Sequence, residues 1–333
     1  MATEREITGP VDLCRADGRL NRAAVGWTRT PMHRANLRGR GRTKRWEYWA
    51  VMSPTEVFTL TVSDLDFGTL HAVWFLDADG TETGVERLTP LARADLPDAP
   101  GGGPVRARAK GLEIDLDPLP DGGTAIRAAT DRITADLTVG RPAGHECLGV
   151  VVPWSDRRFQ YTVKDNTLPA TGTVTVDGVA HDFTAPDTWA VLDHGRGRWP
   201  HRITWNWGAG SGRTADGRTL GIQVGGRWTD GTGSTENSVT VDGRLSKVHD
   251  DLWWDYDTAD WLRPWRIRDP RSGRLDLTLT PFHDRTARTE LGLLGSQVHQ
   301  CFGTWSGWVV TDDDERIEVD NVRGWAEEAR QKW

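Results

Sequence analysis

Residues 173–183 read Thr-Val-Thr-Val-Asp-Gly-Val-Ala-His-Asp-Phe, and this stretch decides the fold class. Apolar and polar residues alternate on both sides of Asp177-Gly178, as they do in half-buried strands. An Asp-Gly pair between two such runs is the strongest short-range signal for a tight β-hairpin. We therefore predict an antiparallel hairpin here.

The same signal recurs along the chain, with further Asp-Gly pairs beginning at residues 17, 79, 121, 216, 230 and 242. This signal predicts a hairpin that joins residues 238–241 to 244–248. A second predicted hairpin joins 265–268 to 274–279 through a longer turn. Residues 124–137 fit a helix or a strand, and their Thr and Ile content favours strand. The tail from Trp325 has a helical pattern, which predicts a short C-terminal helix. The glycine-rich run 208–212 is interpreted as a wide loop or bulge.

Many short strands with tight turns are typical of sandwiches or antiparallel barrels. A length of 333 residues exceeds what one hydrophobic core usually serves. We therefore predict an all-β protein of two barrel-like units, with a first domain at 1–170 and a tryptophan-rich second domain at 171–333.

Composition narrows the functional classes. The net charge of −7 disfavours a nucleic-acid partner. No secretory signal or membrane-length apolar run is present, so we expect a cytoplasmic protein without integral membrane association. Three widely spaced cysteines predict reduced thiols. The one basic segment, between Arg29 and Arg45, is interpreted as a solvated loop, with a phosphate or anion contact as the alternative.

Motifs for common cofactors are absent from the sequence. There is no dinucleotide-binding glycine pattern opening a helix, no Walker loop and no metalloprotease motif. His194 and His201 are seven residues apart without a carboxylate at ligand spacing. We therefore expect neither a cofactor nor a metal, and the sequence does not set the oligomeric state.

Tryptophan is the compositional outlier, with 18 residues against three tyrosines and seven phenylalanines. Such density in the second half predicts either a very aromatic core or an aromatic-lined cavity. The candidate ligand-binding residues in this part of the chain are Trp199, Trp205, Asn206, Trp207, Gln223, Trp228, Glu236 and Asn237.

The candidate catalytic residues are Asp193, His194 and Arg196, which lie next to these tryptophans. Burial beside an aromatic wall would raise the pKa of Asp193 and make it a proton donor. His194 would relay the proton, and Arg196 would stabilise an anion. In the structural alternative, Asp193 caps a turn and the arginine stacks on indole rings.

These motifs carry a resemblance to a known family. Cys14-Arg-Ala-Asp-Gly-Arg-Leu-Asn21, Asp193-His-Gly-Arg-Gly197, Trp205-Asn-Trp-Gly208 and the run from Trp228 to Asn237 resemble a bacterial family of unknown function, over nearly the whole chain. More distantly, the chain resembles the double-lipocalin group of carotenoid 1,2-hydratases, tocopherol cyclase-like proteins and fungal cyclases that assist Diels–Alder reactions.

The resemblance implies two consecutive lipocalin-like (calycin-type) antiparallel β-barrels or strongly curved sheets, with a ligand site in or between them. It also implies cofactor-independent hydratase, cyclase or isomerase chemistry, of lyase or isomerase type, on a polyene- or prenyl-like molecule. An acid, for which Asp193 is the candidate, would protonate an alkene. Two other functions stay open: a carrier that holds a hydrophobic ligand unchanged, and a carbohydrate-binding module using indoles between Trp253 and Trp265.

Overall fold

The computed structural model describes residues 3–38, 42–184, 186–291 and 294–332. Its contacts divide the chain into two compact units. We name them the first unit (Ile7–Trp199) and the second unit (Pro200–Trp333 together with Met1–Glu6). The sequence places the domain boundary between residues 170 and 171, a point inside strand β13 (Arg158–Val176) of the first unit.

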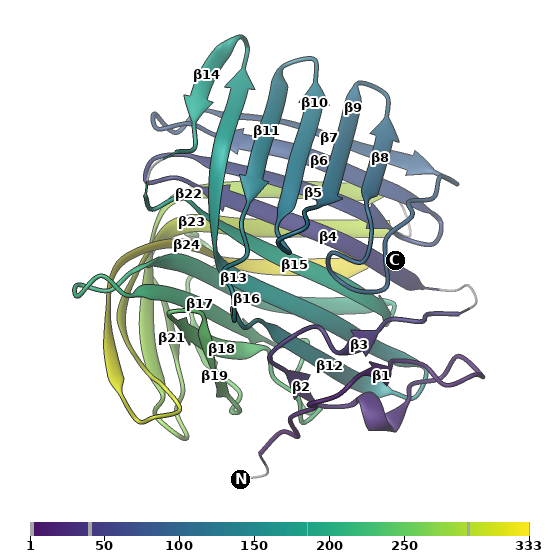
Figure 1. The fold of residues 1–333 in the computed structure, drawn as a ribbon, viewed down its shortest axis with the longest axis vertical. Helices are drawn as coiled ribbons and strands as arrows, with labels where there is room; N and C mark the ends of the chain where they lie inside the picture. The colour runs from purple at the N-terminus through teal and green to yellow at the C-terminus, as the bar shows by residue number, and fades with distance from the viewer. Residues whose placement is uncertain (1–2, 39–41, 185, 292–293, 333) are drawn as a thin grey trace. The chain divides into compact units, whose positions relative to one another are not determined.

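The first unit is built on one antiparallel sheet (Figure 1). Ten strands follow each other in the order β7-β6-β5-β4-β15-β13-β11-β10-β9-β8 and curl into a nearly closed barrel, while β12 and β14 pair with β13, and β2 with β12. The bounds are β1 Val11–Asp12, β2 Trp27–Thr28, β3 His33–Arg34, β4 Thr43–Met52, β5 Val57–Asp64, β6 Gly68–Leu76, β7 Glu82–Pro90, β8 Val105–Ala109, β9 Leu112–Pro118, β10 Thr124–Thr130, β11 Ile133–Val139, β12 Leu148–Ser155, β14 Val179–Asp182 and β15 Trp189–Arg198.

Alternation along the strands builds the core of this unit. In β11, every second residue from Ile133 to Val139 is buried, and the residues between them are exposed. Figure 1 shows β8–β11 lying across β5–β7, and buried residues of both groups, such as Leu60 and Ile114, share one hydrophobic core. The N-terminal segment contains the short 3-10 helix η1 (Arg22–Ala24) and packs Leu13 against Phe159 in a separate cluster.

The second unit is a curled half-barrel of nine antiparallel strands in the order β19-β18-β17-β16-β24-β23-β22-β21-β20. Its core gathers around buried residues such as Trp265 and Trp305. The bounds are β16 Arg202–Arg213, β17 Thr219–Gly226, β18 Asn237–Val241, β19 Arg244–Val248, β20 Trp253–Asp255, β21 Trp265–Arg268, β22 Leu275–Leu291, β23 Leu294–Val310 and β24 Arg316–Lys332.

The all-β prediction is confirmed, as are the three predicted hairpins, which appear as β13–β14, β18–β19 and β21–β22. Residues 124–137 form strands, as expected. Within the described part of the chain, no helix has the length and apolar character needed to cross a membrane.

The predicted C-terminal helix is wrong, because the tail from Trp325 belongs to strand β24. Strand β24 pairs with β16 on one side and with β23 on the other, so Trp325 faces Ala209 and Phe302 in the ladders. Pairing on both sides satisfies the backbone of this strand and overrides the helical propensity of the Ala-Glu-Glu-Ala sequence.

The loop or bulge predicted at residues 208–212 is also wrong, because this run lies within strand β16 and pairs continuously with β17. Its glycines make room for a large side chain rather than for a turn. A Cβ atom on Gly208 would lie 2.9 Å from the Trp305 ring, and one on Gly210 would lie 2.7 Å from it. The indole of Trp305 therefore packs directly on the bare backbone of β16.

Candidate functional site

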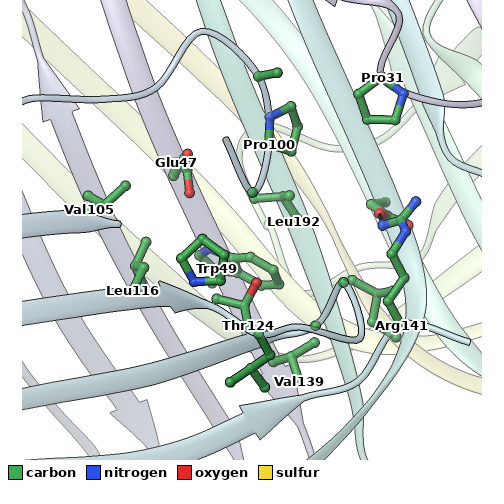
Figure 2. Close-up of a pocket in the computed structure, with 18 of the residues that line it drawn as sticks. Pro31, Glu47, Trp49, Pro100, Val105, Leu116, Thr124, Val139, Arg141 and Leu192 are labelled. Atoms are coloured by element: carbon green, nitrogen blue, oxygen red, sulfur yellow. Dashed lines mark hydrogen bonds and ion pairs between the residues drawn. The ribbon is translucent and has the colours of Figure 1, made fainter. Parts of the chain in front are cut away.

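A cavity of about 390 Å³ opens in the first unit. Apolar side chains from several strands form most of its wall, and glycines and prolines of the loops at 99–103 and 118–123 form its rim. Figure 2 shows Glu47 and Arg141 on opposite sides, with Trp49 and Leu192 between them in this view. The apolar wall comprises Trp49, Val105, Leu116, Leu119, Val139, Leu168 and Leu192, and the charged residues at the cavity are Glu47, Arg141 and Asp165.

Strand alternation places Glu47 at this cavity. Residues of β4 lie directly opposite residues of β15, so that Glu47 pairs with His194 and Trp49 pairs with Leu192. Because every second residue points to the same face of a sheet, Glu47 and Trp49 point to the same side. Both side chains are buried, and the Trp49 Nε1 atom has no hydrogen-bond partner among the described residues.

One oxygen of the Glu47 carboxylate is engaged and the other is not. Oε1 accepts hydrogen bonds from His194 Nδ1 and from Arg196 Nη2, both at 3.3 Å. Within the described residues, no hydrogen bond reaches Oε2. The buried guanidinium of Arg196 is held in turn by backbone carbonyls, at 3.0 Å from Pro97 O and 2.6 Å from Trp46 O. Glu47 is therefore fixed in place, with one oxygen available to a molecule in the cavity.

The charges of this cluster follow from its burial. Burial acts to raise the pKa of Glu47, but the hydrogen bond from His194 and the charge of Arg196 outweigh it and lower that pKa. Burial, aided by the Arg196 charge, lowers the pKa of His194 to about 4. At neutral pH the cluster is therefore a carboxylate beside a guanidinium and a neutral imidazole.

A second carboxylate lies at the other side of the cavity. Asp165 in β13 accepts a hydrogen bond from His145 Nε2 at 2.9 Å and forms an ion pair with Arg141. Asp165 stands opposite Leu192 of β15, and Leu192 stands opposite Trp49 of β4. Asp165 is therefore two strands from β4, and Glu47 lies two residues before the β4 residue in line with it. Strand spacing then puts the two Cα atoms about 12 Å apart. A ligand in this cavity would thus have one carboxyl group at each side.

The structure separates the predicted pair of Asp193 and His194. Because they are neighbours on β15, their side chains point to opposite faces of the sheet. Asp193 accepts from Thr162 Oγ1 at 2.8 Å and from Trp46 Nε1 at 3.0 Å, and it pairs with Lys164 Nζ at 3.1 Å. His194 and Arg196 instead share Glu47, and the catalytic role of Asp193 stays a prediction.

None of the predicted ligand-binding residues lines the described cavity; five of them lie in strands, and Trp199, Trp228 and Glu236 lie outside the strands. Only Trp199 belongs to the first unit. Their contacts within each unit are Trp199 Nε1 to Gln160 Oε1 at 2.6 Å, Trp205 Nε1 to Glu327 Oε1 at 2.9 Å, Asn206 Nδ2 to Tyr256 Oη at 3.0 Å, Trp207 Nε1 to Gln223 Oε1 at 2.9 Å, Trp228 Nε1 to Glu236 Oε1 at 2.5 Å and Gly225 N to Asn237 Oδ1 at 2.7 Å. Their role in ligand binding stays a prediction.

The aromatic run in the second unit is largely an internal stack. The rings of Tyr256 and Trp265 lie parallel at 4.0 Å, and those of Trp261 and His299 do the same. Of the tryptophans in this run, only Trp253 is exposed, at 40%. A flat platform of exposed indoles, as a carbohydrate-binding module would need, is thus not formed by the described residues.

Sequence reasoning missed Glu47, Trp49, Arg141, His145 and Asp165. Glu47 did leave a signal, because it occupies an inward position of a strand whose other inward positions include Trp49 and Val51. A carboxylate at an inward-facing position of a buried strand has to be paired or functional. Asp165 and His145 left none, because their meeting depends on the path of the loop after β11. Within the described residues, no group of three or more His, Cys, Asp or Glu side chains is arranged to hold a metal ion.

The chain was compared with protein families, curated proteins and solved structures. The family described as Domain of unknown function (DUF2804) matches residues 4–333. No curated protein sequence matches the chain. The solved structure of CghA with Sch210972 is similar at a TM-score of 0.55 and 16% identity, covering 92% of this chain and 89% of that one.

An AttH-like protein from Nitrosomonas europaea is similar at a TM-score of 0.51 and 14% identity, covering 86% of this chain and 92% of that one. Kievitone hydratase from Nectria haematococca has a TM-score of 0.47 and 12% identity, with coverages of 86% and 88%. At these identities, the likeness to CghA and the AttH-like protein concerns the fold alone.

Proposed function

The chain belongs to the DUF2804 family, and we propose that it is a cofactor-independent enzyme of hydratase, cyclase or isomerase type acting on a lipophilic small molecule. We assign the reaction to the cavity of the first unit, with Glu47 as the group that takes and returns a proton. One observation carries the proposal: the buried Glu47 carboxylate, at the wall of a largely apolar cavity, has one oxygen that no described residue hydrogen-bonds.

The charge state of Glu47 makes it a proton acceptor in the resting protein. Its lowered pKa means that it is ionised at neutral pH, so it cannot begin by protonating an alkene. An apolar ligand would exclude water from Oε2 and thereby raise the basicity of the carboxylate. Glu47 would then remove a proton from one atom of the ligand, or from an enclosed water molecule whose oxygen adds to the ligand, and return that proton to another atom of the ligand. Such a transfer is redox-neutral and requires no cofactor.

His194 and Arg196 serve this step as positioning residues. Both bind Oε1, which leaves Oε2 as the oxygen that meets the ligand. The nearby indole N–H of Trp49 can offer a hydrogen bond to a polar atom of the ligand. Proton transfer by a carboxylate held in this way typically accelerates a reaction by about 10²–10⁴-fold.

The size of the cavity restricts the substrate. A volume of about 390 Å³ is near the lower end of the roughly 300–1,000 Å³ of ligand pockets. A compact prenyl-like molecule, or one end of a longer chain, suits this space better than a whole polyene. The structure of CghA, which has a similar fold, was determined with Sch210972, and this supports a ligand-holding role for the fold.

A carrier that holds its ligand unchanged is the second candidate. The low pKa of Glu47 favours it, because a carboxylate stabilised by Arg196 is a weaker base. The two candidates share the cavity and differ only in whether a proton moves.

The experiment uses the whole chain and a lipid-soluble extract of its native cells, incubated in D2O and examined by mass spectrometry. The enzyme proposal expects at least one compound to gain deuterium or the mass of water with the wild type, and not with Glu47→Gln. Glu113→Gln, on the exposed face of β9, is the control for charge. A compound that is bound and returned chemically unchanged, with no deuterium, no added water and no shift in chromatographic retention, would establish the carrier, and conversion that survives Glu47→Gln would remove Glu47 from the mechanism.

A further inference from the structure

Arg141 brings a positive charge to the wall of the cavity in the first unit. It follows the end of β11, and both Arg141 and its ion-pair partner Asp165 line the cavity. Figure 2 shows Arg141 on the side away from Glu47. The rim loop at 118–123 supports the side chain, because a Cβ atom on Gly122 would lie 3.5 Å from Arg141 Cδ. The guanidinium is therefore held between Asp165 and the rim.

The guanidinium of Arg141 has more donors than the described residues use. Nη1 pairs with Asp165, Nη2 donates to the carbonyl oxygen of His145 at 3.4 Å, and the Cys147 thiol is a third partner. Three partners leave two of the five N–H groups of a guanidinium unused in the described part of the chain. The side chain keeps 26% of its surface exposed. Arg141 can therefore donate to an oxygen atom of a ligand in the cavity.

Glu47 needs such a donor if it is to take a proton from carbon. Its lowered pKa makes it a weak base, whereas the C–H groups of a hydrocarbon are hardly acidic. A carbonyl group acidifies a C–H group when the negative charge that develops on its oxygen is stabilised. Preorganised hydrogen-bond donors at that oxygen provide this stabilisation in enzymes. Glu47 and Arg141 supply the base and the donor from two sides of one cavity.

The distance between the two sides favours a conjugated carbonyl over a simple ketone. The Cα atoms of Glu47 and Asp165 lie about 12 Å apart, so the C–H group at Glu47 and the oxygen at Arg141 are several bonds apart in the ligand. A double bond between them carries the acidifying effect of the carbonyl to the γ carbon. The apolar side chains of Trp49 and Leu192 lie between the two sides in Figure 2 and suit a flat hydrocarbon unit.

We propose that the substrate is a compact, lipophilic, conjugated carbonyl compound whose oxygen binds Arg141 while its γ C–H group faces Glu47. This inference rests on the proposed function and names its substrate class. Arg141 is then a catalytic residue, because it touches the oxygen on which charge develops.

The reaction moves one proton and one double bond. Glu47 Oε2 takes the γ proton, and the electron pair of that C–H bond forms a double bond between the γ and β carbons. The former α,β pair moves between the α carbon and the carbonyl carbon, and the carbonyl π pair goes to the oxygen at Arg141. Return of the proton from Glu47 to the α carbon restores the carbonyl. The product is the β,γ-unsaturated isomer, and the reaction needs no further reactant.

Binding of 2-naphthol to the full chain tests the Arg141 subsite without turnover. Its anion is flat and carries its charge on one oxygen, as the enolate does, and it absorbs at longer wavelength than neutral naphthol. Glu47→Gln is the host protein, because a neutral amide stands in for protonated Glu47. We expect the host to bind the anion, and Arg141→Met to weaken this binding at least tenfold. Arg29→Met is the matched control, because Arg29 is 27% exposed and pairs with Glu146 but does not line the cavity.

Arg141→Met leaves Asp165 without its ion-pair partner, so circular dichroism checks the folding of each variant. Combining Arg141→Met with Asp165→Asn removes both members of the pair and keeps the test open if the single variant does not fold. Arg141→Lys keeps the positive charge and should recover part of the affinity. Failure of the host to bind the anion, or equal binding after Arg141→Met with Asp165→Asn and after Arg29→Met, overturns the subsite.

A second arm tests the substrate class in the D2O assay with wild-type protein. Borohydride treatment of the lipid extract beforehand converts carbonyl groups to alcohols, and we expect it to abolish deuterium incorporation. Incorporation that survives the treatment overturns the carbonyl assignment and leaves the role of Glu47 standing. Absence of incorporation with the untreated extract counts against the proposed function, whereas binding of the naphthol anion through Arg141 would still establish the subsite.

Discussion

His194 Nδ1 donates a hydrogen bond to Glu47 Oε1 at 3.3 Å across the neighbouring strands β15 and β4, although 147 residues separate the two in sequence. This contact makes stability depend on pH. The folded state lowers the pKa of His194 from 6.5 to about 4, so the unfolded chain binds the proton more tightly. The contribution of this residue is therefore full above about pH 6.5 and is lost as pH falls towards 4.

We expect the free energy of unfolding to decrease by about 3 kcal/mol over this interval, because each pKa unit corresponds to about 1.4 kcal/mol. The lowered pKa of Glu47 adds a loss in the same direction below its ordinary value of 4.5. Urea unfolding at several pH values measures the slope. His194→Asn keeps a donor near Nδ1 but cannot titrate, and its slope between pH 6.5 and 4 should be clearly smaller. An equal slope in both proteins would contradict a buried neutral imidazole.

Glu47 and Arg196 should be energetically coupled. Arg196→Met leaves the Glu47 carboxylate buried without its guanidinium, which should destabilise the first unit by about 3–5 kcal/mol. The double variant with Glu47→Gln removes both charges and should lose less than the sum of the two single losses, by at least about 1 kcal/mol. Urea unfolding of the four proteins gives the coupling energy. Strict additivity would mean that the 3.3 Å contact has no energetic role.

Gly195 should tolerate no side chain. A Cβ atom there would lie 2.0 Å from Cζ2 of Trp46, whose indole covers the strand between Asp193 and Gly197. We expect Gly195→Ala to destabilise the protein by about 3 kcal/mol or more through overpacking. Gly9→Ala is the control, because no atom lies within 4 Å of its added Cβ. Thermal unfolding compares the two, and similar melting temperatures would contradict the packing of Trp46 on β15.

The fold class could be predicted because the turn residues and the strand alternation of each hairpin lie within its own short stretch of sequence. Asp177-Gly178 and Asp242-Gly243 have the positive φ angles that their turns require, and the strands beside them alternate as expected. The tail at Trp325 could not be assigned in this way. Its helical pattern comes from adjacent residues. Its strand partners are Ala209, which is far away in the chain, and Phe302, which lies on the preceding strand β23.

The catalytic role predicted for Asp193, His194 and Arg196 stays a prediction. Glu47 was not predicted as the partner of His194 and Arg196, although its inward position in β4 marks it as a carboxylate that has to be paired or functional. The partner depends on which face of β15 each residue occupies, and a shift of the strand by one residue would exchange the faces of Asp193 and His194. The pairing of β15 with β4 decides it, and these strands are more than 130 residues apart in the chain.

The most direct measurement compares Glu47→Gln with Asp193→Asn in the deuterium incorporation assay, at equal concentrations of folded protein. Each change removes one carboxylate, from the neighbouring strands β4 and β15 and on opposite faces of the sheet. We predict that Glu47→Gln loses at least 100-fold of the incorporation rate and that Asp193→Asn keeps it within a few-fold. Loss in Asp193→Asn with retention in Glu47→Gln would contradict the assignment of the reaction to the cavity of the first unit.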